Sequence, residues 1–409
     1  METLKEAKYS NIPYVSYAKT VYGQKEIDAV VHCLKEGTQM GKYTSKFEKQ
    51  IGQLFDKKHS LYVNSGSSAL YIGMESENFP AGSEIITPAL TFSTTVGCIV
   101  KSNLVPAFVD VGENDYCIDV EKIEQMITKK TVAILAPNLL GNLCKWDKIS
   151  EIAKHYKLKV IEDSADTLGA TLHNKPSGYW SDWSITSFYG SHIINCAGNG
   201  GMLCTNNPQH LNNSKLLRSW GRSSSIFDEK SESIENRFNV NLEGVAYDAK
   251  FIFEKIGYNL EGSEIGAAFG LVQLEDLEKN ICDRENNFNR QTQFFGKYKE
   301  FFNLPQQTKG SRTAWLAYPL IVKYTAPFTR TQLQIFLEKN GVQTRTIFTG
   351  NITKQPGFKN ITMRQQKGGC TNSDNAMKGG ILLACHHGLT EDMFSHMHYV
   401  IEKFLKEFK

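Results

Sequence analysis

Short apolar segments alternate with amphipathic segments along most of the chain. Residues 59–76 and 83–102 each have the pattern strand, turn, helix, residues 105–111 and 131–137 are strand-like, and residues 148–166 predict a helix followed by a strand. Strands that alternate with helices indicate a mostly parallel sheet. Because ligands of such sheets bind at the carboxyl ends of the strands, the segments after each strand are the candidates for a site.

The flanking segments complete an α/β organisation. Amphipathic patterns predict helices at 24–37 and 42–55. After about Asn280 the pattern changes to a strand, a helix that begins at a threonine cap and ends at Gly341, a second strand and a closing helix that begins at Thr390. These four elements cover 314–324, 329–341, 342–348 and 390–408. We therefore expect an N-terminal arm and helix at 1–40, a large domain at 41–280 and a small C-terminal α/β domain at 281–409.

Residues 222–242 form a long polar stretch with few apolar side chains. A segment of this length without its own periodicity is usually functional or disordered. We interpret it as an excursion near the site or at a subunit interface.

The composition excludes several classes of protein. The net charge of +3 is too small to indicate nucleic acid or an anionic membrane surface as a partner. The first 17 residues lack the apolar stretch of a secretory signal, and no apolar run approaches the roughly 18 residues of a membrane span. The nine cysteines form no CxxC pair and no zinc-finger spacing, which favours reduced thiols in a cytoplasmic protein without a metal site.

Two post-strand segments suit a phosphate and a flat ring. Asn64–Ala69 places a glycine and serines between a strand and a helix. Gly66 permits close approach of the backbone, and the N–H groups of Gly66 and Ser67 at a helix start can hold a phosphate. A plain turn before a helix is the alternative. In Pro88–Phe92, the ring of Phe92 either stacks on a flat ligand or packs in the core.

Two further segments offer an acid and a base. Asp163 ends an apolar strand, where a carboxylate needs a cationic partner because a lone buried charge is costly. The protonated ring nitrogen of pyridoxal phosphate (PLP) is such a partner; an aspartate that caps the next helix is the alternative. Ser187 lies five residues before the basic residue His192, and a glycine-rich turn follows at 198–201. That combination is unusual.

The motifs as a set resemble a known family. From about Val21 onward they occur in the order NSGSSA, PALTF, EDSAD, SFYGSH with GNGG, and GYNLEGSEIGAAFGLVQLE. This order is similar to that of the DegT/DnrJ/EryC1/StrS sugar aminotransferases. Three further segments, at 219–222, 247–259 and 341–358, resemble the branch of NDP-4-keto-6-deoxyhexose 3-dehydratases, in which histidine replaces the Schiff-base lysine. The resemblance implies a fold type I, aspartate aminotransferase-like, PLP-dependent homodimer.

The resemblance also implies a cofactor-binding set. Three residues near two strand ends would hold the cofactor phosphate, an aromatic residue would stack on the ring, and an acid would pair with the ring nitrogen. A second acid would lie beside the ring where many members have glutamine, and an asparagine would reach across a dimer interface to the neighbour's cofactor phosphate. In this order the residues are Gly66, Ser67 and Ser187, then Phe92, Asp163, Asp166 and Asn259.

Substrate contacts are implied in the same way. Arg345 is a candidate for the phosphates of the substrate, a task that suits a planar bidentate donor. Trp220 and Arg222 would lie beside the cleft, with Arg222 as a candidate contact of the nucleotide phosphate. His386 and His387 either touch substrate or bind a metal, or they have a surface or packing role. The last reading is favoured.

His192 would stand where an ordinary member has its lysine. Histidine forms no stable Schiff base, but its pKa of about 6.5 suits proton transfer. The cofactor would then be held noncovalently, as PLP or as pyridoxamine phosphate (PMP). Counting back from the turn at 198–201 places Ile193 at this position instead, and neither count finds a lysine, since the nearest are Lys175 and Lys215. The alternative is an ordinary core histidine with another residue as the catalyst.

The implied reaction is loss of the C3 hydroxyl from a 4-keto sugar. His192 would remove a proton from the cofactor's C4′ carbon, and either His192 or another group would protonate the leaving hydroxyl. One group of such dehydratases takes electrons through an iron–sulfur cluster, three of whose four cysteines follow the WGR motif. Residues 222–238 contain no cysteine, so a cluster is not expected. The other group has no cluster, regenerates PMP with L-glutamate and releases ammonia.

The sequence therefore predicts a cytoplasmic PLP/PMP-dependent 3-dehydratase of a nucleotide-linked 4-keto-6-deoxy hexose or heptose, with GDP as the favoured nucleotide. The product would enter 3,6-dideoxy sugars of capsular polysaccharide or lipopolysaccharide. An aminotransferase or a reductase-coupled dehydratase is one alternative. A non-catalytic binding protein on this fold is another. The joint presence of Phe92, Asp163 and Ser187 argues against the latter.

Overall fold

The computed structural model describes residues 13–226 and 234–408. Its largest sheet has eight strands within these ranges, and β9 is antiparallel to both of its neighbours while the other neighbouring pairs are parallel. The predicted mostly parallel sheet is confirmed. In spatial order its strands are β1 (His59–Val63), β9 (Gly201–Thr205), β8 (Trp183–Ser187), β5 (Lys159–Ser164), β4 (Thr131–Pro137), β2 (Glu84–Pro88), β3 (Val105–Val109) and β15 (Arg364–Gln365).

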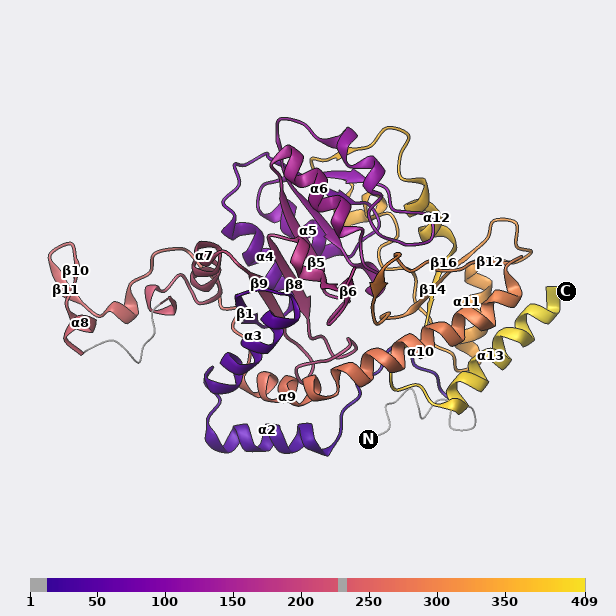
Figure 1. Ribbon diagram of the computed structural model, residues 1–409, viewed down its shortest axis with the longest axis horizontal. Helices are drawn as coiled ribbons and strands as arrows, with labels where there is room; N and C mark the ends of the chain where they lie inside the picture. Colours follow the sequence, from indigo (N-terminus) through magenta and orange to yellow (C-terminus); the bar gives the residue numbers. More distant parts are fainter. Residues whose placement is uncertain (1–12, 227–233, 409) are drawn as a thin grey trace.

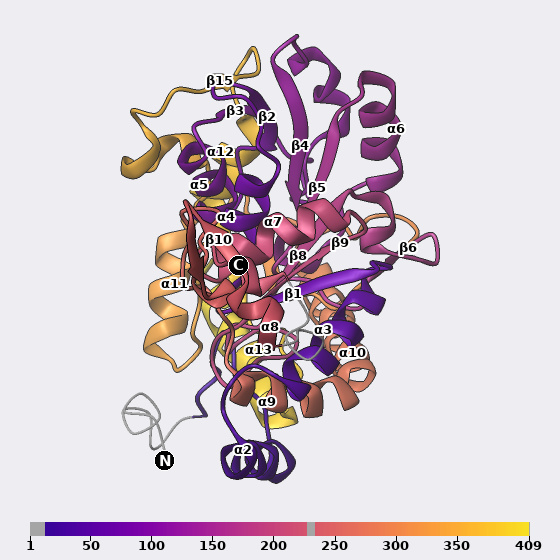
Figure 2. The ribbon, with the colours of Figure 1, turned by 90° about the vertical axis from the view of Figure 1, so that its left-hand side faces the viewer.

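Helices cover both faces of this sheet (Figures 1 and 2). Successive residues of a strand point to opposite faces, so Ala133 and Leu135 of β4 join one apolar cluster and Ile134 and Ala136 join another. The first cluster contains residues of α4 (Gly66–Ser76), α5 (Ser93–Lys101) and α7 (Pro208–Arg218), and the second contains residues of α6 (Trp146–Tyr156). A one-residue slip would move each strand's apolar set to the wrong face, which fixes the register.

The N-terminal helices form as predicted. They are α2 (Gln24–Glu36) and α3 (Lys42–Leu54), which pack against α9 (Glu264–Glu275). The Glu264 carboxylate is buried and accepts hydrogen bonds from the N–H groups of Gly41, Tyr43 and Thr44 at the start of α3. An acid at a helix N-terminus satisfies donors that have no partner inside the helix. This contact joins α3 to the chain more than 200 residues later.

A second sheet, β12 (Phe302–Asn303), β14 (Tyr318–Val322) and β16 (Gly380–Leu383), is antiparallel. Around it lie α10 (Leu277–Phe295), α11 (Arg330–Lys339), α12 (Thr371–Gly379) and α13 (Glu391–Leu405). The predicted caps are present, because the Thr329 and Thr390 side chains accept hydrogen bonds from the N–H groups of Gln332 and Met393. The domain boundary at 280 stays a prediction, and α10 runs across it.

The predicted strand at 342–348 is wrong. Val342 and Arg345 make only isolated bridges, to Val15 and to Leu382, and Phe348 has a φ of 39°. The chain here passes from the N-terminal segment to the edge of the small sheet, so it forms no continuous ladder of hydrogen bonds with either. The helix before it also ends two residues earlier than Gly341, at Lys339.

The described part of the polar stretch and the segment after it project from the body as an arm, which we define as residues 222–226 and 234–258 (Figure 1). It carries α8 (Ile234–Phe238) and the hairpin of β10 (Val240–Leu242) and β11 (Val245–Tyr247). Residues 227–233 of the predicted excursion lie outside the described residues. A further small sheet consists of β6 (Thr171–Leu172), β7 (Lys175–Pro176) and β13 (Ser311–Arg312).

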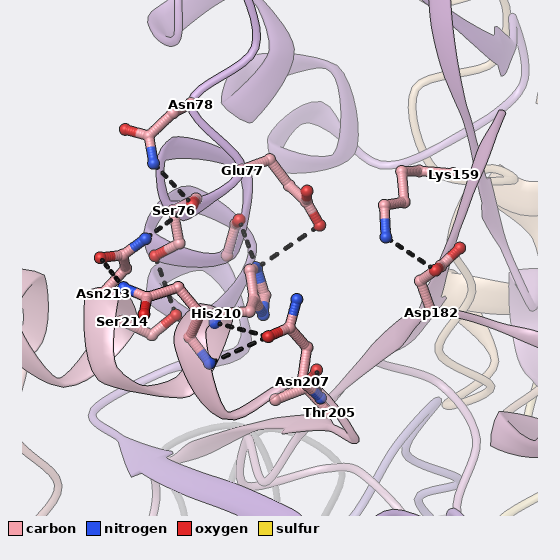
Figure 3. Close-up of polar contacts among 12 residues, drawn as sticks. Ser76, Glu77, Asn78, Lys159, Asp182, Thr205, Asn207, His210, Asn213 and Ser214 are labelled. Atoms are coloured by element: carbon pink, nitrogen blue, oxygen red, sulfur yellow. Dashed lines mark hydrogen bonds and ion pairs between the residues drawn. The ribbon is translucent and has the colours of Figure 1, made fainter. Parts of the chain in front are cut away.

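A buried polar cluster fixes α7, which leads into the arm, to the end of α4 (Figure 3). His210 Nε2–H donates to the Gly73 carbonyl over 2.9 Å, and the hydroxyls of Ser76 and Ser214 lie 2.9 Å apart. Burial lowers the pKa of His210 to about 4, so its ring is neutral and serves as a donor. We assign this cluster a structural role, because its hydrogen bonds link helix to helix and it contacts no cavity described below.

No helix in the described ranges is long and apolar enough to span a bilayer.

Candidate active site

The carboxyl ends of β1, β2, β5 and β8 meet at one edge of the sheet, where a cavity of about 410 Å³ opens. The small domain contributes Leu316 and Phe348 to its wall, and the N-terminal segment contributes Tyr17. The structure thus brings together most of the predicted site. The predicted residues that line the cavity are Gly66, Ser67, Phe92, Asp163, Asp166, Ser187 and His192.

An anion cradle lies at the start of α4. Ser65 caps the helix by accepting a hydrogen bond from the Ser68 N–H, which leaves the N–H groups of Gly66 and Ser67 without a partner inside the helix. A Cβ added at Gly66 would lie 2.8 Å from the Cβ of Ser187, so the cradle has room only for glycine. Free N–H groups, a helix dipole and the Ser187 hydroxyl are what a phosphate needs.

Asp163 offers a carboxylate at the cavity without a cationic side chain to balance it. It is buried, with Oδ2 accepting from Thr95 Oγ1 at 2.7 Å and Oδ1 from the Ala165 N–H at 3.1 Å. Burial raises its pKa, and the two hydrogen bonds oppose that rise. In the described ranges it forms no ion pair with lysine or arginine. A protonated ring nitrogen would supply the missing positive charge.

Asp166 is half-buried beside Asp163. Its Oδ2 accepts the Leu140 N–H at 2.9 Å, but burial, with a smaller contribution from Asp163, raises its pKa to about 7. It therefore carries a proton over part of the physiological range. An acid of this kind can donate as well as accept a proton near neutral pH.

Asp166→Asn should make the ligand-free protein more stable at pH 8 and leave it unchanged near pH 4. A carboxyl whose folded pKa is raised contributes stability below its unfolded pKa of about 3.9 and loses it as pH rises through about 7. The asparagine avoids that loss, which we put on the order of 1–2 kcal/mol, discounted for partial exposure. Thermal melts at pH 4, 6 and 8 measure it, with Glu113→Gln, an exposed loop acid, as the control. A gain that is the same at every pH contradicts this assignment.

His192 lies in the segment between β8 and β9. Its ring Nδ1 is 3.2 Å from the Ser187 carbonyl oxygen, and its backbone N–H donates to the Tyr189 carbonyl at 2.9 Å. Burial first, and then the nearby Arg284 guanidinium, lower the pKa of its imidazole to about 4. The ring is thus neutral at physiological pH. Such a ring can accept a proton from a ligand in the cavity.

Two ways of counting had placed either His192 or Ile193 at the lysine position. The Ile193 side chain is buried in the apolar cluster beside Phe47 and does not line the cavity. Among the described residues no lysine lines the cavity either, and Lys175 instead contacts the ring of Tyr179. Of the two candidates, His192 lines the cavity and Ile193 does not.

The substrate residues predicted from the resemblance are not in the main cavity. Arg345 lines a neighbouring cavity of about 510 Å³, which shares Tyr17, Phe92 and Phe348 with the first. It therefore lies beside the site, and its guanidinium is 5.7 Å from the centre of the Tyr17 ring. An anionic ligand could extend from one cavity into the other.

Trp220, Arg222 and Asn259 lie at the base of the arm, away from the cavity of their own chain. The Arg222 guanidinium lies 5.0 Å from the centre of the Trp220 ring, and the rings of Phe251 and Phe253 are also close to it. The expected position of Trp220 and Arg222 beside the cleft is therefore not met within one chain. A position near the site would require a second subunit.

The two histidines at 386 and 387 have packing roles. His386 is buried, with Nε2–H donating to the Ser16 carbonyl at 3.1 Å, and its Nδ1 accepts the Gly388 N–H. His387 Nδ1 accepts a hydrogen bond from Arg284 at 3.2 Å. Neither lines the cavity, which agrees with the favoured reading of the sequence.

Sequence reasoning missed Tyr17, Thr95 and Arg284. Burial, followed by the nearby Asp166, raises the pKa of Tyr17, so its phenol faces the site in the protonated form. A signal for Arg284 did exist, because it interrupts the apolar stripe of α10 formed by Leu277, Ile281, Phe288 and Phe295. A charged residue on a buried stripe usually has a function or a partner.

Comparison with known proteins adds to this geometry. The model of the DegT/DnrJ/EryC1/StrS aminotransferase family matches residues 21–404. The chain is 33% identical to the lipopolysaccharide biosynthesis protein RfbH of Salmonella typhimurium, covering 94% of this chain and 89% of that protein. It is 32% identical to the dTDP-4-dehydro-2,6-dideoxy-D-glucose 3-dehydratase of Saccharopolyspora spinosa, covering 87% and 78%. The chain therefore belongs to the DegT/DnrJ/EryC1/StrS family.

A solved structure agrees with the fold. A GDP-4-keto-6-deoxymannose 3-dehydratase with a trapped PLP–glutamate geminal diamine superposes with a TM-score of 0.83 at 27% identity, covering 95% of this chain and 100% of that one. The expected fold type I is confirmed, and the family is PLP-dependent. The cradle at Gly66 and the unbalanced Asp163 fit that cofactor.

Proposed function

We propose that this member of the DegT/DnrJ/EryC1/StrS family is a PLP/PMP-dependent 3-dehydratase of a nucleotide-linked 4-keto-6-deoxy sugar. The observation that carries the proposal is His192, a neutral base in the cofactor cavity, where no lysine lines the wall among the described residues. Relatives and a solved neighbour that are named 3-dehydratases support it. GDP is the favoured nucleotide, and the sugar is a hexose or a heptose destined for surface polysaccharide.

The cofactor, when bound, supplies an amine that condenses with the sugar ketone and an electron sink for the departing C3 hydroxyl. Gly66, Ser67 and Ser187 would hold its phosphate. The Phe92 side chain lines the cavity, is half exposed, and would stack on the cofactor ring. Asp163 would hold the proton on the ring nitrogen, because the buried carboxylate gains a counter-charge only when that proton is present.

His192 would take the proton from the C4′ carbon. Because its pKa is lowered to about 4, it is free to accept a proton at any physiological pH. Asp166, with a pKa of about 7, is the group best suited to protonate the leaving hydroxyl, and Tyr17 lies close enough to Asp166 to shape that side of the cavity. L-Glutamate would return the amine, and ammonia would be released as the dehydrated product hydrolyses.

The placement of the cysteines supports a cluster-free cycle. Eight of the nine are buried as free thiols, and the exposed one is Cys282 on α10. Within the described ranges no three histidines, cysteines or acids are grouped as they would be around a metal ion. Because an iron–sulfur cluster needs about four thiolates together, glutamate rather than a reductase is the proposed source of reducing equivalents and nitrogen.

Ammonia distinguishes this function from its nearest alternative. Incubation with PLP, L-glutamate and GDP-4-keto-6-deoxymannose should yield one 2-oxoglutarate and one ammonia for each 3-deoxy sugar, without a reductase. An aminotransferase, which the family name makes the second candidate, would instead retain the nitrogen in an amino sugar. Retention of all the nitrogen in the sugar contradicts the proposed function.

The active unit would be a homodimer with shared sites. The arm carries exposed aromatic and aliphatic side chains at Ile234, Phe251, Phe253 and Ile256, which favour contact with another protein surface. Asn259 at its base is exposed and lies outside its own cavity, which suits the expected reach to a neighbouring cofactor phosphate.

Mixing two inactive variants tests the shared site. If Asn259 serves the neighbouring subunit, a dimer of His192→Asn and Asn259→Ala chains has one site with both defects and one intact site. Co-refolding equal amounts should therefore restore about a quarter of wild-type activity, since half of the dimers are mixed and each has one of two sites intact. Mixing His192→Asn with Asp163→Asn should restore none. Equal results from both mixtures would show that the sites are not shared.

Gly66→Ala should weaken PLP binding by at least about tenfold, because the new methyl would displace Ser187 and fill the cradle. Gly296→Ala is the matched control, since no atom lies within 4 Å of its added Cβ and its φ is −53°. Fluorescence titration of the ligand-free proteins with PLP gives both dissociation constants. Unchanged affinity in Gly66→Ala would place the phosphate elsewhere.

A further inference from the structure

Arg284 is a fully buried arginine on α10 without an acidic partner. Its exposure is 0%, and the titratable groups that affect its pKa most are the Cys385 thiol and the Tyr17 phenol, both neutral at neutral pH. Within the described ranges it makes no ion pair with a carboxylate. Burial lowers its pKa to about 10, so it still carries its charge at neutral pH. Burying a charge without an opposite charge costs free energy, so the arginine is expected to have a structural or functional role.

The guanidinium connects three separate segments. Nη1 donates to the Trp315 and Leu316 carbonyls, each at 3.1 Å, at the entry to β14. Nε donates to His387 Nδ1 at 3.2 Å in the segment after β16. Nη2 donates to the carbonyl oxygen of His192 at 3.4 Å. One side chain therefore ties the His192 segment to the small domain.

His192 needs such an anchor more than a lysine would. A lysine in covalent linkage is fixed at both ends, whereas the imidazole of His192 is held at one end by its own backbone and otherwise by noncovalent contacts, with the Ser187 carbonyl at 3.2 Å and with the edge of the Tyr189 ring. We propose that Arg284 is a positioning residue that anchors the backbone of His192 to the small domain and so keeps the imidazole in the cofactor cavity. The proposal rests on the proposed function for the role of His192.

The charge of Arg284 adds an electrostatic effect. The titratable groups in the same cavity are Asp163, Asp166, Tyr17 and Tyr189, and Arg284 lies outside the cavity lining, at the backbone carbonyl of His192. His387, which accepts from Arg284, and the buried Cys385 thiol lie beyond it and are uncharged at neutral pH. Arg284 is thus the only cation with an effect on His192 among the described residues, and removing it should make the imidazole easier to protonate.

Histidine-selective carbon-13 NMR of the ligand-free protein tests the charge directly. The His192 signal is assigned by its loss in His192→Asn. In Arg284→Met its titration midpoint should move up by about 0.5–1 pH unit. Arg284→Lys, which keeps a charge, should move it by less than half of that. Arg290→Met, on the same helix but in an exposed ion pair with Glu391, should not move it.

Amide hydrogen exchange tests the anchor. In Arg284→Met, amides of residues 188–198 should exchange at least about tenfold faster than in the wild type, while those of α13 should not change. His387→Leu removes one acceptor of Arg284 but keeps the charge. His387→Leu should accelerate exchange in the same segment to a smaller degree, without moving the His192 titration midpoint. If Arg284→Met fails to fold, His387→Leu is the variant that tests the anchor.

The glutamate half-reaction separates failure of this inference from failure of the proposed function. Conversion of bound PLP to PMP by L-glutamate should be independent of pH between 5.5 and 8 in the wild type, and in Arg284→Met its fall at acidic pH should begin about 0.5–1 pH unit higher than in the wild type. A wild type that converts glutamate, together with an unmoved His192 midpoint and unchanged exchange in Arg284→Met, overturns the role of Arg284. A wild type that does not react with glutamate refutes the proposed function, whatever the NMR result for the ligand-free protein.

Discussion

His192→Asn should lower turnover by about 10²–10⁴-fold while leaving the affinity for PLP within about threefold of the wild type. The loss follows because asparagine cannot take up the C4′ proton. Affinity is retained because the phosphate cradle and Asp163 are untouched. Product formation from the nucleotide sugar measures the first quantity and PLP fluorescence titration the second.

The matched control is His155→Asn, which changes an exposed histidine on α6 and should alter neither quantity. A His192→Asn variant that keeps more than about a tenth of wild-type turnover would remove His192 from the reaction. A variant that loses PLP together with activity would show that the imidazole holds the cofactor instead of moving a proton.

Asp163→Asn should raise the dissociation constant for PLP and lower turnover, each by about 10–100-fold. The amide cannot balance a protonated ring nitrogen, and hydrogen bonds to charged groups contribute about 1.5–3 kcal/mol. Because burial raises the pKa of Asp163, the substitution should not destabilise the ligand-free protein at pH 8. Titration with PLP, turnover and a thermal melt are measured on the same preparation.

Asp110→Asn provides a buried control for Asp163→Asn. The Asp110 carboxylate accepts the N–H groups of Asn372 and Ser373 at the start of α12, away from the cavity. Its loss should lower the melting temperature without changing PLP affinity. If Asp163→Asn shows the same pattern as Asp110→Asn, its carboxylate serves the fold and not the cofactor.

Much of the fold followed from local sequence patterns. The parallel sheet was predictable because its strands are buried on both faces and separated by amphipathic helices, and Thr329 and Thr390 were recognisable as caps. The error at 342–348 has a physical cause. Whether an apolar segment becomes a strand depends on whether a neighbouring strand has a free edge to pair with. Here only Arg345 pairs with the edge strand β16, at Leu382, while Val342 pairs with Val15 of the N-terminal segment.

The site was partly predictable for a related reason. Asp163 and Ser187 lie at the carboxyl ends of the parallel strands β5 and β8, and the carboxyl ends of parallel strands lie at one edge of the sheet. Tyr17 and Arg284 reach the same place from an N-terminal segment and a helix about 270 residues apart, and no local pattern reports such a meeting. Trp220, Arg222 and Asn259 lie at the base of the arm and away from the cavity of their own chain, so only the proposed dimer would bring them near a site.

The most direct test of the central claim is mass spectrometry of the sugar products of the wild type and of His192→Lys. Each protein is incubated with PLP, L-glutamate and GDP-4-keto-6-deoxymannose, and with a heptose homologue if the hexose is not consumed. The account predicts a 3-deoxy keto sugar from the wild type and an amino sugar or no product from His192→Lys. An amino sugar from the wild type, or unchanged 3-deoxy product from His192→Lys, would contradict it.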